Sequence, residues 1–146
     1  MNKKKLHPLL FSVVFMCLSL LIAASGVWAQ VVVIANKNVP ADSVSADSIK
    51  DIYLGNKGSW NNGQKVVFVT LKSGEANDTF MQKYVSKSSS QFNSYWKKMV
   101  FTGKGSFPKA FDSDDEMVKY ISVTDGAIGY VSPGTNTNGV KTINVN

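Results

Sequence analysis

Residues 70–74 carry side chains of the types that bind a small anion. The run Thr-Leu-Lys-Ser-Gly follows an apolar segment and precedes a helical pattern, so we expect it at a step from a strand to a helix. A helix start leaves backbone N–H groups without partners and carries the positive end of the helix dipole. With Thr70, Lys72, Ser73 and the Gly74 backbone as neighbours, this step predicts a binding site for an oxyanion.

The same residues also fit a simple helix cap followed by a glycine in a tight turn. Glu75 favours this alternative, because a carboxylate in the first helical turn would compete with a bound anion. Two other segments are weaker candidates. Residues 102–106 (TGKGS) lack the spacing of a phosphate-binding loop. The acidic residues within 112–116 lack the alternation of a calcium loop and are expected at a helix start.

Several kinds of chemistry are excluded by residue types that residues 30–146 do not contain. The chain has no arginine, and its single histidine and cysteine, His7 and Cys17, lie in the first 29 residues. The remainder therefore has no disulfide, no thiolate or imidazole metal ligand and no Ser-His-Asp triad. We expect no enzyme and no cofactor. Thirteen lysines and ten acidic residues give this part a net charge of +3, which is too low to indicate nucleic-acid binding.

Residues 1–29 have the pattern of a secretory signal peptide. Three consecutive lysines are followed by a largely apolar run at residues 9–24, and small residues at Val27 and Ala29 suit a cleavage site. We therefore expect a mature chain that begins at Gln30, forms one domain over residues 30–146 and is exported, for example to a periplasm. An uncleaved N-terminal anchor is the alternative.

Apolar and capping patterns predict strands alternating with helices. Strands are expected at residues 31–35, 65–71, 127–131 and 140–145. The first is apolar throughout, which is typical of a strand buried on both faces, as in a parallel sheet. Helices are expected after the caps Ser45, Ser88 and Ser113 and after Gly74; Gln91 and Glu116 complete capping boxes with the second and third serines. The alternation indicates a layered α/β domain with right-handed crossovers.

Four segments in sequence order resemble the periplasmic phosphate-binding component of bacterial ABC transporters, and in particular its small single-lobe relatives. Residues 45–66 (SADSIKDIYLGNKGSWNNGQKV) are similar to a family stretch in which a helix ends in "DIFLG" and runs on to a tryptophan. Residues 71–80 (LKSGEANDTF) resemble the helix start that contains Ser-Gly. Residues 95–111 (YWKKMVFTGKGSFPKAF) and 126–132 (GAIGYVS) match later phrases of the family.

The resemblance implies one lobe of the type II periplasmic-binding-protein fold, with a central mixed or mostly parallel sheet flanked by helices. It implies a phosphate-like oxyanion as ligand and a transporter or other envelope protein as partner. The family's "RSxxSGT"-like turn corresponds here to residues 71–75, without its arginine and with Glu75 in place of a hydroxyl residue. Ser73 and Gly74 keep the family role, and Thr70 and Lys72 could substitute for the missing donors.

The sequence supports two hypotheses of function. The first is a solute-binding protein of the phosphate-transporter type, which holds a small oxyanion at residues 70–74 and near the Trp60 loop. A single lobe is only half of a clamp, so a second subunit, as in a homodimer, would strengthen binding. The second is a non-transport interaction module that contacts an envelope protein and needs no small ligand. The missing arginine and Glu75 favour the second hypothesis. The resemblance covers nearly all of residues 31–143 in the family's order and favours the first, which we take as the prediction, with the second as the alternative.

Overall fold

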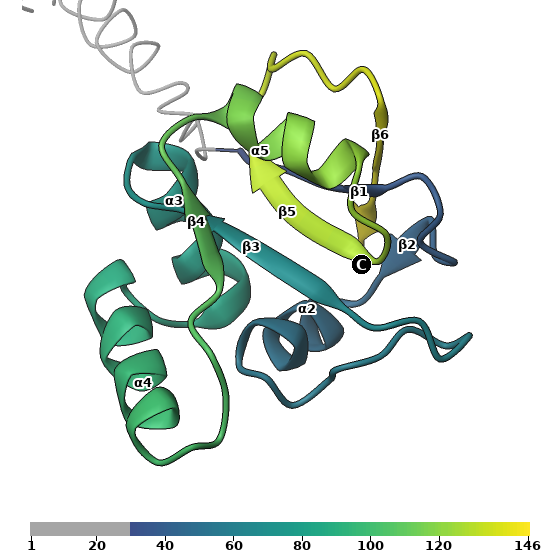
Figure 1. Cartoon of the computed structure of the whole chain (residues 1–146). Coiled ribbons are helices and arrows are strands. Elements are labelled where there is room, and N and C mark those ends of the chain that lie inside the picture. Colours follow the sequence, from purple (N-terminus) through teal and green to yellow (C-terminus); the bar gives the residue numbers. More distant parts are fainter. Residues whose placement is uncertain (1–29) are drawn as a thin grey trace, which may run out of the picture.

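The computed structural model describes residues 30–146, and the expected signal peptide, residues 1–29, lies outside the described residues. Strands and helices alternate along most of the described chain (Figure 1). In chain order the elements are β1 (Val32–Asn36), β2 (Ser43–Val44), α2 (Ala46–Tyr53), β3 (Val67–Leu71), α3 (Glu75–Phe80), the π-helix η2 (Met81–Val85), α4 (Ser89–Phe101), β4 (Lys109–Phe111), α5 (Asp114–Ser122), β5 (Ala127–Val131), β6 (Val140–Thr142) and β7 (Asn144–Val145).

The central sheet is mixed and has the strand order β4-β3-β5-β1-β6. Strand β3 runs parallel to both β4 and β5, whereas β1 runs antiparallel to both β5 and β6. A two-stranded sheet of β2 and β7 lies beside it. The fold class expected from the sequence, an α/β lobe with a mixed sheet flanked by helices, is confirmed.

The direction suggested for β1 is wrong. Residues Val33, Ile34 and Ala35 are buried, as the apolar run predicted, but the strand is antiparallel to each of its neighbours. An apolar run indicates that both faces of a strand are buried. Helices cover both faces of this mixed sheet, so the run is explained without a parallel arrangement. Strand direction depends on the connections between strands, which the run does not encode.

Helices cover both faces of the sheet, because successive side chains along each strand point to opposite faces and both sets are packed. On one face, Gly129 of β5 lies against Met117 and Ile121 of α5. On the other, Tyr53 of α2 packs on Phe68 of β3 at 5.0 Å between ring centroids. Successive strand residues point to opposite faces, so Thr70 shares its face with Phe68. Thr70 therefore points toward the α2–α3 side.

The predicted serine caps are confirmed, with one change. The hydroxyls of Ser45, Ser88 and Ser113 each accept a hydrogen bond from a backbone N–H in the first turn of their helix. Ser88 and Gln91 form the complete capping box. At α5 the box is incomplete, because the Glu116 carboxylate accepts from the Asp112 N–H, at 3.3 Å, instead of from Ser113. Local capping patterns are thus read correctly, except where a neighbouring residue offers a second donor.

Some element boundaries differ from the expectations. The helix that follows Gly74 becomes a π-helix at Met81. Strand β4, which pairs with β3, was not among the expected strands. The last expected strand is interrupted at Ile143, whose N–H donates to Val33 O, and its second part pairs with β2. The pairings of β4 with β3 and of β7 with β2 join segments distant in sequence, which local patterns do not indicate.

Gly126 is expected to be far less tolerant of alanine than Gly63, although both have positive φ, +75° and +83°. A Cβ at Gly126 would lie 2.0 Å from the backbone oxygen of Lys65, whereas a Cβ at Gly63 meets nothing within 4 Å. We expect Gly63→Ala to cost about 1–2 kcal/mol from backbone strain, and Gly126→Ala about 1–3 kcal/mol more. Urea unfolding of residues 30–146, which contain the whole described core, measures both free energies. Equal losses would contradict the backbone clash.

Candidate functional site

The candidate site lies at the edge of the sheet where three parallel strands end. Strands β3, β4 and β5 end at Leu71, Phe111 and Val131, and α3 and α5 begin at the same edge. In α/β sheets, ligands bind outside the carboxyl ends of the strands, where loops and helix starts converge. Two separate hollows are present here.

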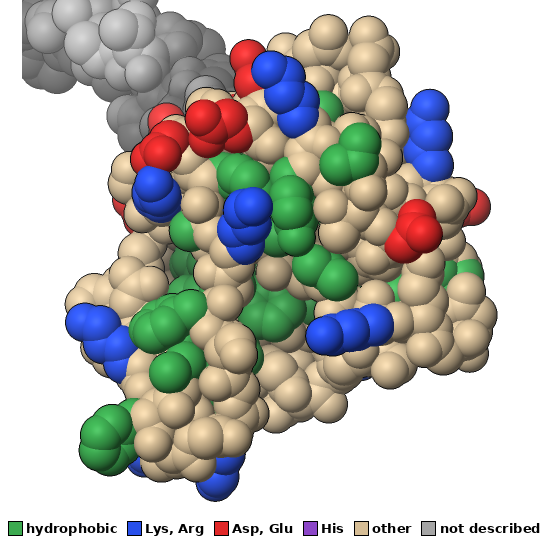
Figure 2. Space-filling model, viewed as in Figure 1, with side chains coloured by type: hydrophobic (Ala, Val, Ile, Leu, Met, Phe, Trp, Pro, Cys, Tyr) green, Lys and Arg blue, Asp and Glu red, His purple; other side chains and the backbone are tan. Residues whose placement is uncertain are grey.

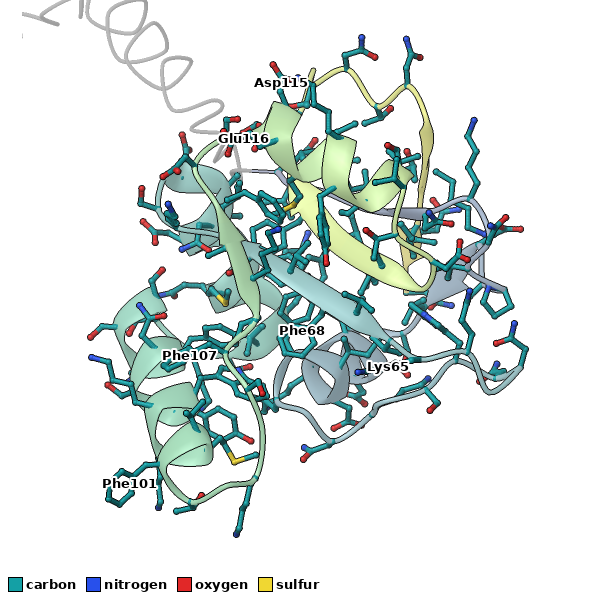
Figure 3. All side chains as sticks on the ribbon, in the orientation of Figure 1. Lys65, Phe68, Phe101, Phe107, Asp115 and Glu116 are labelled. Atoms are coloured by element: carbon teal, nitrogen blue, oxygen red, sulfur yellow. The ribbon has the colours of Figure 1, made fainter. Side chains whose placement is uncertain are left out.

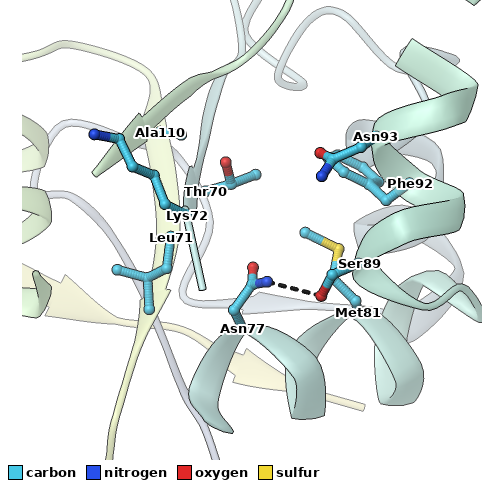
Figure 4. Close-up of a pocket in the computed structure, with 9 residues that line it drawn as sticks. All are labelled: Thr70, Leu71, Lys72, Asn77, Met81, Ser89, Phe92, Asn93 and Ala110. Carbon is cyan, nitrogen blue, oxygen red and sulfur yellow. Dashed lines mark hydrogen bonds between the residues drawn. The ribbon is translucent and has the colours of Figure 1, made fainter. Parts of the chain in front are cut away.

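The first hollow, called here the Thr70 hollow, lies between the end of β3 and the helices α3 and α4 (Figure 4). Its volume is about 170 Å³. It is lined by hydroxyl, amide, lysine and apolar residues, and no carboxylate is among them: Thr70, Leu71, Lys72, Asn77, Met81, Ser89, Phe92, Asn93 and Ala110. Thr70 and Asn93 face one another across the hollow (Figure 4). Such a lining offers hydrogen-bond donors without repelling an anion.

The second hollow, called here the Ser73 hollow, lies between the starts of α3 and α5 and has a volume of about 280 Å³. Ser73, Gly74 and Ser132 line it together with three acidic residues, Glu75, Asp112 and Asp114. Among residues 30–146, no group of three or more acidic, histidine or cysteine residues is arranged to hold a metal ion. The negative charge of this hollow opposes the binding of an anion.

The four residues predicted to bind a ligand are therefore divided between the hollows. Thr70 and Lys72 line the first, and Ser73 and Gly74 line the second. The division follows from strand geometry, because consecutive residues at the end of β3 point to opposite faces of the sheet. A linear run of suitable residues thus does not form one cluster of side chains.

Gly74 begins α3 without a side-chain cap, unlike the serines that precede α2, α4 and α5. Its φ of 103° requires glycine, and the space where a Cβ would stand is open. The next residue, Glu75, is exposed and lies in the first turn, where its carboxylate is favoured by the helix dipole. The turn therefore has one feature of each interpretation. The helix start is open, as an anion site requires, and a carboxylate lies beside it, which favours a simple helix start.

The carboxylate of Asp114 occupies donors at the Ser73 hollow. It accepts a hydrogen bond from the Ser132 N–H at 3.1 Å and another from the Thr135 hydroxyl at 2.9 Å. An anion bound there would have to displace this carboxylate and tolerate its charge. The Ser73 hollow is consequently the weaker of the two candidates.

Lys72 supplies the positive charge nearest to the Thr70 hollow, but its amine is engaged elsewhere. Its Nζ lies 2.7 Å from a carboxylate oxygen of Asp112, and both side chains are more than half exposed. In Figure 4 the Lys72 side chain extends away from Thr70. An exposed ion pair of this kind is weak, so the lysine can be redirected at little energetic cost.

A chain of hydrogen bonds, buried at Tyr130 and increasingly exposed toward Ser89 and Asp78, lies beside the Thr70 hollow. The hydroxyl of Tyr130 accepts from the Leu71 N–H at 3.2 Å and donates to Asn77 Oδ1 at 2.6 Å. Asn77 Nδ2 donates to the Ser89 hydroxyl, which in turn donates to Asp78 Oδ1. Burial raises the pKa of Tyr130, so its hydroxyl stays protonated and continues to donate.

Sequence reasoning missed Asn77, Ser89 and Asn93. One signal was available for Asn77: it lies three and four residues before the buried Phe80 and Met81, and so on the inner face of the helix. A polar residue at such a position needs a buried partner. Asn93 and Ser89 reach the hollow only through the packing of α4, which no local pattern indicates.

The Trp60 loop, which was expected beside residues 70–74, lies elsewhere. Trp60 is buried, and its indole N–H donates to Gly126 O at 3.0 Å, just before β5 begins. It is therefore at the opposite end of β5 from the Thr70 hollow, and the expected neighbourhood of the Trp60 loop and residues 70–74 is wrong. Tyr130 belongs to the core, stacked on Phe80 at 3.8 Å between centroids.

Comparison with known proteins identifies the family. A model of the PBP superfamily domain matches residues 27–144. The chain belongs to this family. No curated protein matches it by sequence. The resemblance inferred from the four segments is confirmed at the level of family and fold.

Solved structures of phosphate-binding proteins share the fold of this family member. One, described as a phosphate ABC transporter substrate-binding protein from Clostridium perfringens with bound phosphate, has a TM-score of 0.61 and 20% identity over 80% of this chain and 45% of that chain. PstS from Borrelia burgdorferi has a TM-score of 0.62 and 16% identity, covering 81% of this chain and 47% of that one. An ABC-type phosphate transport receptor from Vibrio cholerae has a TM-score of 0.54 and 18% identity, covering 81% of this chain and 47% of that chain. The chain spans less than half the length of these structures.

Tyr130→Phe is expected to destabilise the domain, because it leaves the Leu71 N–H and Asn77 Oδ1 without their buried partner. Each unpaired group costs about 1–3 kcal/mol. Tyr84→Phe is the matched control, since this partly buried tyrosine has no hydrogen bond from its hydroxyl among residues 30–146; we expect a change within about 0.5 kcal/mol. Denaturant unfolding measures both variants. A Tyr130→Phe loss no larger than that of the control would show that the hydrogen-bond chain contributes nothing.

Proposed function

We propose that the chain is an extracytoplasmic solute-binding lobe of the phosphate-transporter type, and that it holds a small oxyanion such as phosphate in the Thr70 hollow. The observation that carries this proposal is the lining of that hollow, which has hydroxyl, amide and lysine groups and no carboxylate, at the carboxyl edge of parallel strands. Family membership and the fold shared with phosphate-binding proteins support it. In this proposal Thr70 and Lys72 contact the ligand, while Ser73 and Gly74 form the turn that positions them.

The donors available in the Thr70 hollow set the expected affinity. Asn77 and Ser89 are already engaged with each other, which leaves the Thr70 hydroxyl, the Asn93 amide and a redirected Lys72. Two neutral donors and one exposed lysine only partly offset the cost of removing water from a doubly charged anion. We therefore expect a dissociation constant on the order of 1 mM for the isolated lobe. A transporter subunit or a second copy covering the hollow would tighten binding.

A second candidate function is an interaction module that contacts an envelope protein without a small ligand. Two observations favour it. Asp114 takes the Ser132 and Thr135 donors of the Ser73 hollow, and Asp112 takes the Lys72 amine. Most of the polar groups that could bind a ligand therefore already have hydrogen-bond or ion-pair partners within the lobe.

We also propose that the chain is exported and cleaved after Ala29. Intact-mass measurement on protein released from the periplasm of producing cells is expected to show a chain beginning at Gln30. Recovery of the full chain in the membrane fraction, with Met1 retained, would instead support the anchored alternative.

Titration of residues 30–146 with phosphate and with sulfate, followed by calorimetry or amide chemical shifts, tests the oxyanion site. Thr70→Val, which keeps the shape and removes the hydroxyl, is expected to weaken binding about tenfold. Lys72→Ala should also weaken it, whereas Asp112→Asn should strengthen it by releasing Lys72 from its ion pair. Lys119→Ala, an exposed lysine on α5, serves as the control for net charge.

The sign of the Asp112→Asn effect separates the two candidate functions. An interaction module has no reason to gain affinity for phosphate when this carboxylate is neutralised. No heat and no shift change at roughly 10 mM phosphate would reject the oxyanion proposal and leave the interaction module.

A further inference from the structure

Positive charge is concentrated in one continuous part of the chain. No acidic residue lies between Asp78 and Asp112, and the 33 residues between them contain six lysines: Lys83, Lys87, Lys97, Lys98, Lys104 and Lys109. The remainder of residues 30–146 has seven lysines and ten acidic residues, a net charge of −3. The domain is therefore strongly polarised, with the positive part formed by η2, α4 and the segment leading into β4.

The same part carries three of the four large apolar side chains that are exposed among residues 30–146. Phe101 is 92% exposed, and Phe107 and Val100 are also exposed; the fourth such residue, Val123, lies at the end of α5. Figure 3 places Phe101 at the outer end of α4 and Phe107 on the segment that returns toward the sheet. We call the exposed lysines and large apolar residues at this end of α4 the α4 tip; they are Lys97, Lys98, Val100, Phe101, Lys104 and Phe107.

The α4 tip is convex and has charge of one sign. Figure 2 shows an apolar side chain protruding beside lysines at the lower left, with the acidic side chains on other parts of this face. The two ion pairs among residues 30–146 join Lys72 to Asp112 and Lys141 to Asp42, so the lysines of the tip take part in neither. The tip thus combines an accessible aromatic ring with accessible positive charge.

The α4 tip is also held in a defined conformation. The Thr102 hydroxyl donates to Lys98 O at 2.8 Å, and the Lys104 N–H donates to Met99 O at 2.9 Å, which closes the end of the helix. Gly105 passes so close to the Trp96 ring that a Cβ would lie 2.9 Å from it. The segment after α4 is therefore folded back on Trp96. Phe101 is presented by an ordered turn, which limits the entropy lost on binding.

We propose that the α4 tip docks on an anionic lipid surface, with Phe101 entering the headgroup region and the lysines around it facing acidic headgroups. Exposed aromatic side chains partition into the membrane interface, and lysines near the surface add electrostatic attraction to acidic lipids. A protruding tip without a groove fits a deformable lipid surface better than it fits a rigid protein partner. No helix within residues 30–146 is long and apolar enough to span a bilayer.

Docking rests on the proposed export but is separate from the oxyanion site. The Thr70 hollow is lined by Phe92 and Asn93, in the N-terminal half of α4, whereas the tip is at the other end of this 13-residue helix. A helix of this length spans about 20 Å. Lipid contact at the tip therefore leaves the hollow open.

The test measures binding of residues 30–146 to vesicles of phosphatidylcholine with and without phosphatidylglycerol. Binding is expected only where phosphatidylglycerol is present, and it should fall as salt is added. Phe101→Ala should weaken it about tenfold, and the triple variant Lys97→Gln, Lys98→Gln, Lys104→Gln about 100-fold. All these side chains are exposed, so the variants should fold as the parent does.

Matched controls are Val123→Ala, an 82% exposed apolar residue away from the tip, and Lys119→Gln; both should bind vesicles as the parent does. Thr70→Val should also leave vesicle binding unchanged, and Phe101→Ala should leave the phosphate titration unchanged, so failure of one proposal is distinguishable from failure of the other. Absence of binding to phosphatidylglycerol vesicles, or equal binding by all variants, overturns lipid docking. If the parent protein is a dimer in solution and Phe101→Ala converts it to a monomer, lipid docking is overturned and the α4 tip instead binds a second copy of the chain.

Discussion

The hydroxyl of Tyr130 is the point through which the sheet and two helices are joined. It accepts from Leu71 of β3 and donates to Asn77 of α3, and Asn77 then donates to Ser89 of α4. The two bonds of the Tyr130 hydroxyl are buried beside the Phe80–Tyr130 ring stack, and the Asn77–Ser89 bond is partly buried. Buried polar groups in such a chain stabilise one arrangement, because any other arrangement leaves several of them unpaired. The position of α4 over the end of β3, and hence the Thr70 hollow, depends on it.

The same network limits what the lobe can bind. Each donor used to fix α3 and α4 is unavailable to a ligand, and the acids at the starts of α3 and α5 use other donors or repel anions. A phosphate dianion needs many converging donors to compensate for lost hydration. The geometry of the fold family is present in this chain, but much of its hydrogen-bonding capacity is used internally. This is the physical reason for expecting weak binding by the lobe alone.

Sequence patterns predicted the features that depend on neighbouring residues. The caps at Ser45 and Ser88 are set by a spacing of three residues. The antiparallel direction of β1 and the pairing of β2 with β7 depend on contacts across most of the chain, and no local pattern records them. The site was divided for a related reason. Residues 70–74 were read as one cluster, but a strand directs alternate side chains to opposite faces, so Thr70 and Ser73 reach different hollows.

The two proposed contacts use opposite ends of α4, so it matters whether this helix can transmit an effect between them. Coupling requires a contact that differs between two states of the protein. Helix α4 is tied to the end of α2 by two hydrogen bonds, from Trp96 Nε1 to Tyr53 O at 3.0 Å and from the Tyr95 hydroxyl to Leu54 O at 2.6 Å. These two bonds and the contact of Trp96 with Phe68 oppose a shift of α4 large enough to move Asn93 out of the hollow. A lipid contact at the exposed tip supplies no interaction that compensates for the loss of these contacts, so the two ends of α4 act independently.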